Sequence, residues 1–197
     1  MFDRSLLRRS PLEVAPLLLG ATLSCGDVAV RITEVEAYLG IEDPGSHAFR
    51  GQTKRNSTMF GDAGHLYTYF TYGMHVCANV VCSPVGVGNG ILIRAGEVIR
   101  GIPIAEERRP TAKTFVDLAR GPARLVTALG IRLDDDGDDL ESGRVTLDLA
   151  AAPALFAQGP RTGVSGPGGS DTYPWRFWIP GDPTVSPYKR SVPKKRS

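Results

Sequence analysis

Apolar and polar residues alternate most regularly between residues 28 and 38, where β-branched side chains recur at every second position. A period of two predicts a strand, because successive side chains of a strand point to opposite faces. One face of this strand should carry Val28, Val30, Ile32, Glu34, Glu36 and Tyr38. Two acidic residues would thus extend an otherwise apolar stripe, and apolar surroundings make a carboxylate more basic.

Shorter apolar and aromatic runs bounded by glycine or proline predict the remaining strands. Two of them lie within residues 65–82 and are joined around Tyr72 and Gly73, and others cover residues 90–95, 145–149 and 175–179. Residues 40–62 are rich in Gly, Ser, Asn and charge, so they should form a long loop with room for a helical turn. Loops of this length are usually functional.

Two helices have clear start and stop signals. Residues 10–13 read SPLE, a capping box with proline at the first helical position, and Gly20 ends the helix that follows. Pro16 lies beyond its first turn and predicts a kink or an early break there. A second helix should span residues 121–129 and end at Gly130. Together these segments predict a mixed α and β fold.

Length and composition limit how the chain is organised. Its 197 residues, 42% of them hydrophobic, suffice for one core, and no repeat or linker divides them, so a single domain is expected over residues 1–197. Residues 186–197 hold five Lys or Arg residues and should form a flexible basic tail. The N-terminus shows neither a cleavable signal nor a spanning segment, so a soluble, intracellular protein without membrane contact is expected.

The cysteines and histidines argue against disulfides and metals. Cys25, Cys77 and Cys82 are odd in number and form no close CxxC pair, so buried reduced thiols are expected. The three histidines lack the spacing of a metal triad, and no GxxxxGKS/T or GxGxxG motif is present to cradle phosphates. No cofactor is therefore expected.

Charge is unevenly distributed along the chain. The net charge is only +2, but residues 134–141 hold six acidic residues and no Lys or Arg. The rest of the chain is therefore basic, which suits a face toward a polyanion, although an acidic loop in solvent needs no function. A calcium loop is not indicated, because Gly137 sits two residues after Asp135 and no Glu stands at the final position of a twelve-residue loop.

Three features are candidates for chemistry. Glu34 and Glu36 project from a strand among apolar neighbours, although an edge strand with two solvated acids would look the same. Tyr72 stands at the apparent turn between two strands, where an aromatic ring either wedges between base pairs or is an ordinary surface tyrosine. Arg94 lies inside an apolar strand, where its charge must meet a carboxylate, a phosphate or water. Glu34 and Glu36 are its candidate partners, in a structural or a catalytic ion pair.

These segments occur in an order that resembles a known family. TEVEAYLG at 33–40, YTYFTYGM at 67–74 and ILIRA at 91–95 are similar to motifs of the alkyladenine (3-methyladenine) DNA glycosylases, the family that includes the human enzyme. The resemblance continues through the His47 loop, RN at 55–56, MF at 59–60, GPARL at 121–125, GPRTGV at 159–164 and RF at 176–177. It departs from the family at 165–170, where SGPGGS replaces an aromatic and acidic stretch.

The resemblance implies roles for individual residues. Glu36 would be the general base and, with Arg94, would hold a water facing the anomeric carbon of a nucleotide flipped out of the duplex. The residues that would form the pocket for the flipped base are Tyr38, His47, Tyr69, Asn79 and Leu92. Asn79 would crowd the exocyclic amino group of guanine, and Tyr72 would fill the space that the nucleotide leaves. These motifs contain no nucleophilic lysine, so no strand cleavage is expected.

The resemblance also implies a fold, a substrate and a cellular setting. The fold would be a single α+β domain with a curved, mostly antiparallel sheet and flanking helices, like the C-terminal domain of formyltransferases. The protein would be a monomer that acts in base excision repair on double-stranded DNA containing damaged purines. It would be cytoplasmic and work at the nucleoid in a bacterium, or nuclear in a eukaryote.

Two functions of other classes stay open at this point. A damage-binding protein on the same scaffold would recognise lesions without excising them, and Tyr72 with the basic residues would suffice for that. An unrelated hydrolase could use Glu34 and Glu36 as a carboxylate pair on carbohydrate.

Overall fold

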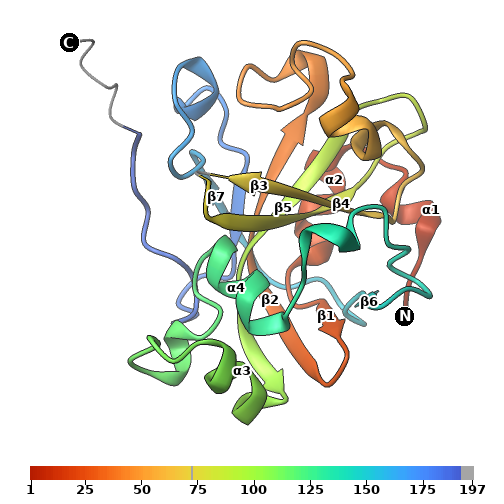
Figure 1. Cartoon of the computed structure of the whole chain (residues 1–197). Coiled ribbons are helices and arrows are strands. Elements are labelled where there is room, and N and C mark those ends of the chain that lie inside the picture. Colours follow the sequence, from red (N-terminus) through yellow and green to blue (C-terminus); the bar gives the residue numbers. More distant parts are fainter. Residues whose placement is uncertain (72, 192–197) are drawn as a thin grey trace.

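The computed structural model describes residues 1–71 and 73–191, and within them the strands form one eight-stranded antiparallel sheet (Figure 1). The strands are β1 (Thr22–Cys25), β2 (Val28–Leu39), β3 (Leu66–Thr71), β4 (His75–Val81), β5 (Asn89–Arg100), β6 (Val145–Asp148), β7 (Ala157–Gly159) and β8 (Arg176–Trp178). The order across the sheet is β3-β4-β5-β2-β1-β6, and β8 pairs with both β2 and β7. The predicted α+β fold with an antiparallel sheet is confirmed.

Short helices flank this sheet. The α-helices are α1 (Arg4–Leu7), α2 (Pro11–Leu18), α3 (Ile102–Arg108) and α4 (Pro122–Leu129), and the 3-10 turns are η1 (Gly40–Glu42), η2 (Lys54–Phe60), η3 (Phe115–Asp117), η4 (Leu133–Asp135) and η5 (Pro167–Gly169). α2 packs against β2 and β5, and α4 packs against β4 and β5. In Figure 1 the long arrows of β2 and β5 cross the middle of the molecule, with α3 and α4 close together at their lower end.

Both predicted helices form, with one difference. α2 starts at the capping box of Ser10 and Glu13, and α4 ends at Gly130, whose backbone is left-handed. The early break expected at Pro16 does not occur, because α2 continues to Leu18. Pro16 lies in the last turn, so the helix loses little backbone hydrogen bonding before it ends.

One hydrophobic core joins the helices to the sheet. Leu18 of α2 and Leu125 of α4 are fully buried in it together with apolar residues of β1, β2, β4, β5 and β6. Burial of each such side chain contributes roughly 1.5–3 kcal/mol. The three cysteines, Cys25, Cys77 and Cys82, are free and buried, as predicted.

The face that β2 turns toward the core differs from the prediction. Its core residues stand at even positions up to Ile32 and then at odd positions from Val35 onward. This change of phase coincides with an irregularity in the pairing of β2 with β5 between Ile32 and Val35. Bulges of this kind re-aim the side chains of a strand. Glu34 and Glu36 therefore do not continue the apolar stripe to which the alternation assigned them.

Beyond this irregularity, core residues alternate along the strands with residues that line a cavity. On β2, the core residues Val35 and Ala37 alternate with the cavity residues Glu36 and Tyr38. On β5, the core residues Ile91 and Ile93 alternate with the cavity residues Leu92 and Arg94. On β4, the core residues Ala78 and Val80 alternate with the cavity residues Cys77 and Asn79. Successive side chains of a strand point to opposite faces. One face of these strands is therefore core, and the other is the floor of the cavity.

The acidic residues 134–141 form a loop that ion pairs and hydrogen bonds hold against the rest of the domain. Two of their aspartates pair with arginines, and two other aspartates accept backbone N–H groups of β3 and β6. The four residues are Asp135, Asp136, Asp138 and Asp139. The acidic cluster thus supports neighbouring strands and is not simply solvated.

The first part of the predicted basic tail is attached to the domain. Ser186 is buried, and its N–H donates to Glu34. The carbonyl oxygen of Lys189 accepts the N–H of Gly163. Lys194, Lys195 and Arg196 lie outside the described residues.

Candidate active site

A cavity of about 390 Å³ lies on the face of the sheet that is turned away from the core. Its volume falls within the usual range of small-molecule sites. β2, β3, β4, β5, the long loop, the first turn of α4 and residues 162–165 contribute to its wall. The residues predicted for catalysis and for the base pocket all line it, namely Glu36, Arg94, Tyr38, His47, Tyr69, Asn79 and Leu92. Tyr72, the predicted wedge, lies outside the described residues.

Strand register builds the floor of this cavity. Tyr67 of β3 stands opposite Asn79 of β4, and Asn79 also stands opposite Leu92 of β5. Leu92 in turn stands opposite Glu36 of β2. Directly opposed residues of antiparallel strands share a face. These four residues therefore form a continuous row across four strands, and rigid elements hold such a row more precisely than loops would.

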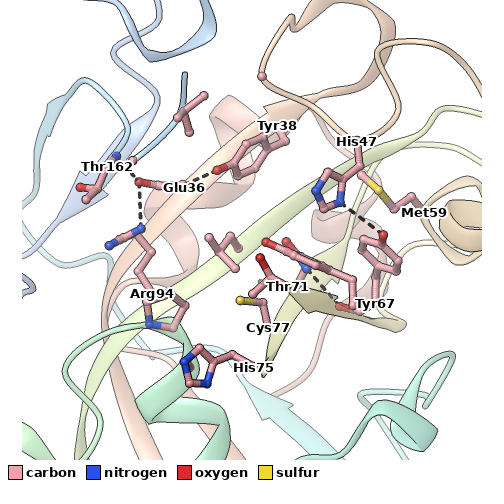
Figure 2. Close-up of a pocket in the computed structure, with 18 of the residues that line it drawn as sticks. Glu36, Tyr38, His47, Met59, Tyr67, Thr71, His75, Cys77, Arg94 and Thr162 are labelled. Atoms are coloured by element: carbon pink, nitrogen blue, oxygen red, sulfur yellow. Dashed lines mark hydrogen bonds and ion pairs between the residues drawn. The ribbon is translucent and has the colours of Figure 1, made fainter. Parts of the chain in front are cut away.

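Glu36 is fully buried at one end of this row, where two hydrogen bonds and one ion pair hold its carboxylate (Figure 2). The Thr162 N–H donates to its Oε1 over 2.7 Å, and the Tyr38 hydroxyl donates to its Oε2 over 2.9 Å. Nη1 of Arg94 lies 3.4 Å from Oε1. Both oxygens of the Glu36 carboxylate are therefore engaged. The surroundings of Glu36 are thus polar at its head, in contrast to the apolar setting that the strand pattern suggested.

Arg94 contacts both glutamates of the motif. Its Nε donates to Oε1 of Glu34 over 3.1 Å, while its Nη1 faces Glu36. Glu34 is fully buried and does not line the cavity, whereas Arg94 does. The sequence left open whether Arg94 belongs to a structural ion pair or to one at the cavity. In the structure, the guanidinium group of Arg94 takes part in both, with Glu34 outside the cavity lining and with Glu36 inside it.

Tyr38 forms one side wall of the cavity. Burial and the neighbouring Glu36 carboxylate raise the pKa of Tyr38 well above its usual value, so its hydroxyl stays protonated and donates to Glu36. The guanidinium carbon of Arg161 lies 4.5 Å from the centroid of the Tyr38 ring. A cation over a ring face stabilises the ring's position. Arg161 does not line the cavity, so the Tyr38 ring separates the Arg161 guanidinium group from the cavity.

Tyr67, Tyr69 and His47 form another wall of the cavity. Figure 2 shows His47 and Tyr67 on the other side of the cavity from Tyr38. The rings of Tyr67 and Tyr69 stack with centroids 5.7 Å apart, and His47 meets Tyr69 edge-on at 4.4 Å. Burial raises the pKa of Tyr67 to about 12. Desolvation by the cavity wall and the charge of Arg55 lower the pKa of His47, so its imidazole is neutral at neutral pH. Aromatic side chains thus line the cavity together with Tyr38, and such rings can stack on a flat aromatic ligand.

A second buried ion pair supports the site from behind. The Arg161 guanidinium contacts both carboxylate oxygens of Asp43 and also donates to the carbonyl oxygens of Ala37 and Gly168. Both side chains are fully buried. Burial alone would lower the pKa of Arg161, but the bond to Asp43 and the neighbouring acidic groups together outweigh it and the pKa is raised. Because Thr162 follows Arg161 directly, this pair fixes the N–H that reaches Glu36.

Several residues of the cavity are not identified by sequence reasoning. They are Pro44, Gly45, Met59, Tyr67, Thr71, His75, Cys77, Pro122, Ala123 and residues 162–165. The period of two along β3 could have revealed Tyr67 and Thr71, which share a face with Tyr69. Met59 and Thr162 come from loops whose path no local pattern indicates.

Neither a metal site nor a membrane span is found in the described residues. Among them, no group of three His, Cys, Asp or Glu side chains is arranged to hold a metal ion. No helix in this part of the chain is long and apolar enough to cross a bilayer.

Comparison with known proteins identifies the family. A family model described as methylpurine-DNA glycosylase (MPG) matches residues 5–183. The chain belongs to this family. The match includes every residue that lines the cavity, and it also covers Glu34 and Arg176.

Bacterial relatives of this MPG family member are similar over most of their length. A Leifsonia xyli protein named "Putative 3-methyladenine DNA glycosylase" is 58% identical over 190 residues, which cover 92% of this chain and 89% of the relative. A Streptomyces avermitilis protein of the same name is 50% identical over 202 residues, covering 98% and 94%. A third, from Nocardia farcinica, is 52% identical over 190 residues, covering 92% and 88%.

Proposed function

We propose that this chain is a monofunctional DNA glycosylase that removes alkylated purines, such as 3-methyladenine, from double-stranded DNA. The observation that carries the proposal is the position of Glu36, a buried carboxylate held by two hydrogen bonds and an ion pair at the floor of an aromatic-walled cavity. A carboxylate at this place can take a proton from water, and the walls offer π faces to a base.

The damaged nucleotide leaves the base stack, and its base enters the cavity between Tyr38 and the opposite wall. Tyr69 and His47 supply a ring face and a hydrogen-bonding edge on that side. An electron-poor alkylated purine stacks well between such rings. Asn79, whose Nδ2 donates to the carbonyl oxygen of Tyr67, stands on the floor and crowds the exocyclic amino group of an undamaged guanine.

Hydrolysis then needs only one positioned water. Glu36 and Arg94 hold this water toward the anomeric carbon, and Glu36 takes one of its protons as the new C–O bond forms. The C–N bond to the base breaks, and its electron pair leaves with the purine. Alkylation has already weakened that bond, so the enzyme mainly stabilises oxocarbenium character. The products are a free base and an abasic site.

The absence of a lyase step is part of the proposal. A lysine amine would be needed to form a Schiff base with the opened sugar. The described residues that line the cavity include no lysine. The expected product is therefore an abasic site in an intact strand.

Duplex DNA with a single alkylated purine tests this function. In single-turnover reactions the wild-type protein should release the free base and leave a strand that breaks only after alkaline treatment. Tight binding with no free base would instead identify a damage-binding protein. A panel of methylated, deaminated and etheno purines would then define the lesion preference.

A carbohydrate hydrolase with Glu34 and Glu36 as its catalytic pair fits the contacts poorly. Glu34 is fully buried outside the cavity lining, and its oxygens are engaged by Arg94, Arg176 and Ser186. It therefore cannot protonate a leaving group in the cavity. Activity on sugars but not on DNA would reverse this conclusion.

Tyr72 is proposed as the wedge that holds the duplex open. Tyr72→Ala should weaken binding to a lesion in duplex DNA by about 1–3 kcal/mol, the usual contribution of one stacked aromatic side chain. Excision from a single-stranded substrate should change little, because no base stack has to be opened. Fluorescence anisotropy and excision assays on both substrates check this. Equal losses on the two substrates would remove the wedge role.

A further inference from the structure

Glu34 is a fully enclosed carboxylate close to the cavity. Its side chain is fully buried, and it takes no part in the cavity lining. Oε1 lies 3.1 Å from Nε of Arg94 and 2.8 Å from Nε of Arg176, and Oε2 accepts the Ser186 N–H over 2.7 Å. The Arg176 contact is a charge pair whose angle is not that of a hydrogen bond. Glu34 is therefore fixed from three directions.

Arg94 is the group that connects Glu34 to the cavity. Its Nε donates to Glu34, its Nη2 donates to Oγ of Ser186 over 3.2 Å, and its Nη1 faces Oε1 of Glu36. A guanidinium group is planar and rigid, so fixing two of its nitrogens determines where the third one points. The partners on the far side of Arg94 thus set the direction of the nitrogen that meets Glu36.

The charges of this cluster balance only when all four members are present. Glu34 and Glu36 carry two negative charges, and Arg94 and Arg176 carry two positive charges. Burial alone would lower the pKa of Arg94, but Glu36 and Glu34 outweigh it and the pKa is raised. Loss of the Glu34 charge would leave two buried arginines beside a single carboxylate.

We propose that Glu34 is a positioning residue of the excision reaction, which acts on Glu36 and its water through Arg94. It orients the Arg94 guanidinium and offsets the charge of Arg176, so that Glu36 can still take a proton when the reaction requires it. This role rests on the proposed glycosylase function and deepens it. Glu34 itself touches neither the water nor the base.

Other groups also face Glu36, and they stay unchanged in the test. Tyr38 and Thr162 donate to it directly. The remaining charged or titratable groups near it are Arg94 on β5, Tyr69 on β3, Cys77 on β4 and Arg161 beside Thr162. If the pH dependence of base release changes when only Glu34 is replaced, the change is therefore due to the loss of the Glu34 charge.

Glu34→Gln is the decisive variant, measured by single-turnover base release across a range of pH. The maximal rate should fall about tenfold to a hundredfold, as expected for a small misplacement of a catalytic group. The acidic limb of the rate profile should also move to lower pH. The sign follows because a base works only when ionised, and loss of the Glu34 charge leaves the positive charge of Arg94 less compensated beside Glu36. Glu34→Asp keeps the charge, so its acidic limb should stay near that of the wild type.

Two further variants keep the result interpretable. Glu97→Gln makes the same change in the Glu97–Arg31 pair, away from the cavity lining, and should alter neither rate nor pH profile. Ser186→Ala removes only the Oγ contact to Arg94, so it should lower the rate about threefold to tenfold without moving the acidic limb. If Glu34→Gln does not fold, Ser186→Ala becomes the deciding variant. A rate of base release equal to that of the wild type for Ser186→Ala would then overturn the positioning role.

The outcomes separate this role from the function itself. If the wild type releases base and Glu34→Gln matches it in rate and acidic limb, the positioning role is wrong while the glycosylase function stands. A lower rate with an unshifted acidic limb in Glu34→Gln would also overturn the role, since a purely structural loss has that result. If the wild type releases no base from any alkylated duplex, the proposed function falls, and the role of Glu34 falls with it.

Discussion

Replacing Glu36 with glutamine should slow base release by about 10²- to 10⁴-fold, because a neutral amide cannot take the proton of the attacking water. At 1.36 kcal/mol for each tenfold, this corresponds to about 3–5 kcal/mol in the activation barrier. Glutamine has the shape of glutamate, and its carbonyl oxygen can still accept the Thr162 N–H. Binding to lesion DNA should therefore stay close to that of the wild type.

Single-turnover excision and a direct binding measurement on the same alkylated duplex separate these two effects. Glu42→Gln is the matched control, because Glu42 is exposed and does not line the cavity. Its rate and affinity should equal those of the wild type. Undiminished base release by Glu36→Gln would show that another group activates the water.

Asp43→Asn is expected to cause the largest loss of stability. The substitution keeps the size of the side chain but leaves the Arg161 charge buried without a carboxylate to balance it. Breaking a buried ion pair in this way usually lowers the free energy of unfolding by about 3–5 kcal/mol. For a chain of this length that corresponds to a decrease in Tm of roughly 6–20 °C. Excision should decline as well, because the Arg161 segment carries the Thr162 N–H that holds Glu36.

Thermal and urea unfolding followed by circular dichroism measure this loss. Arg8→Ala provides the comparison, since it removes the Arg8–Asp62 pair, in which the arginine is half exposed. Exposed pairs contribute about 0–1 kcal/mol, so this variant should unfold close to the wild type. Equal stability of Asp43→Asn and Arg8→Ala would contradict the structural importance of the buried pair.

Local patterns predict the long elements of this protein and the short strands β6 and β8, but not β1 and β7. The alternation over residues 28–38 corresponds to β2, and the capping box and Gly130 mark α2 and α4. β1 and β7 have four and three residues, too few for a period to be recognised. They are strands because β2 and β8 pair with them, which no local signal encodes.

The face on which Glu34 and Glu36 lie could not be read from the alternation. A period of two assumes regular pairing, and the irregularity between β2 and β5 changes the phase at this point. The phase change turns Glu36 toward the cavity, and Glu34 meets Arg94 and Arg176 outside the cavity lining. The two acids look equivalent in sequence and have different surroundings in the fold.

The sequence by itself determined the type of the long helices and strands, the reduced cysteines, and the resemblance that singles out Glu36 and Arg94. It predicted the extent of β2 but only half of β5, which continues to Arg100. Tertiary structure alone decided that Thr162, 126 residues away, donates to Glu36, and that Arg161 stands behind Tyr38. Local preferences depend on chain neighbours, which a sequence displays directly. The partners of a buried charge depend on the register of distant strands and on the paths of loops, and these are set only when the whole core packs.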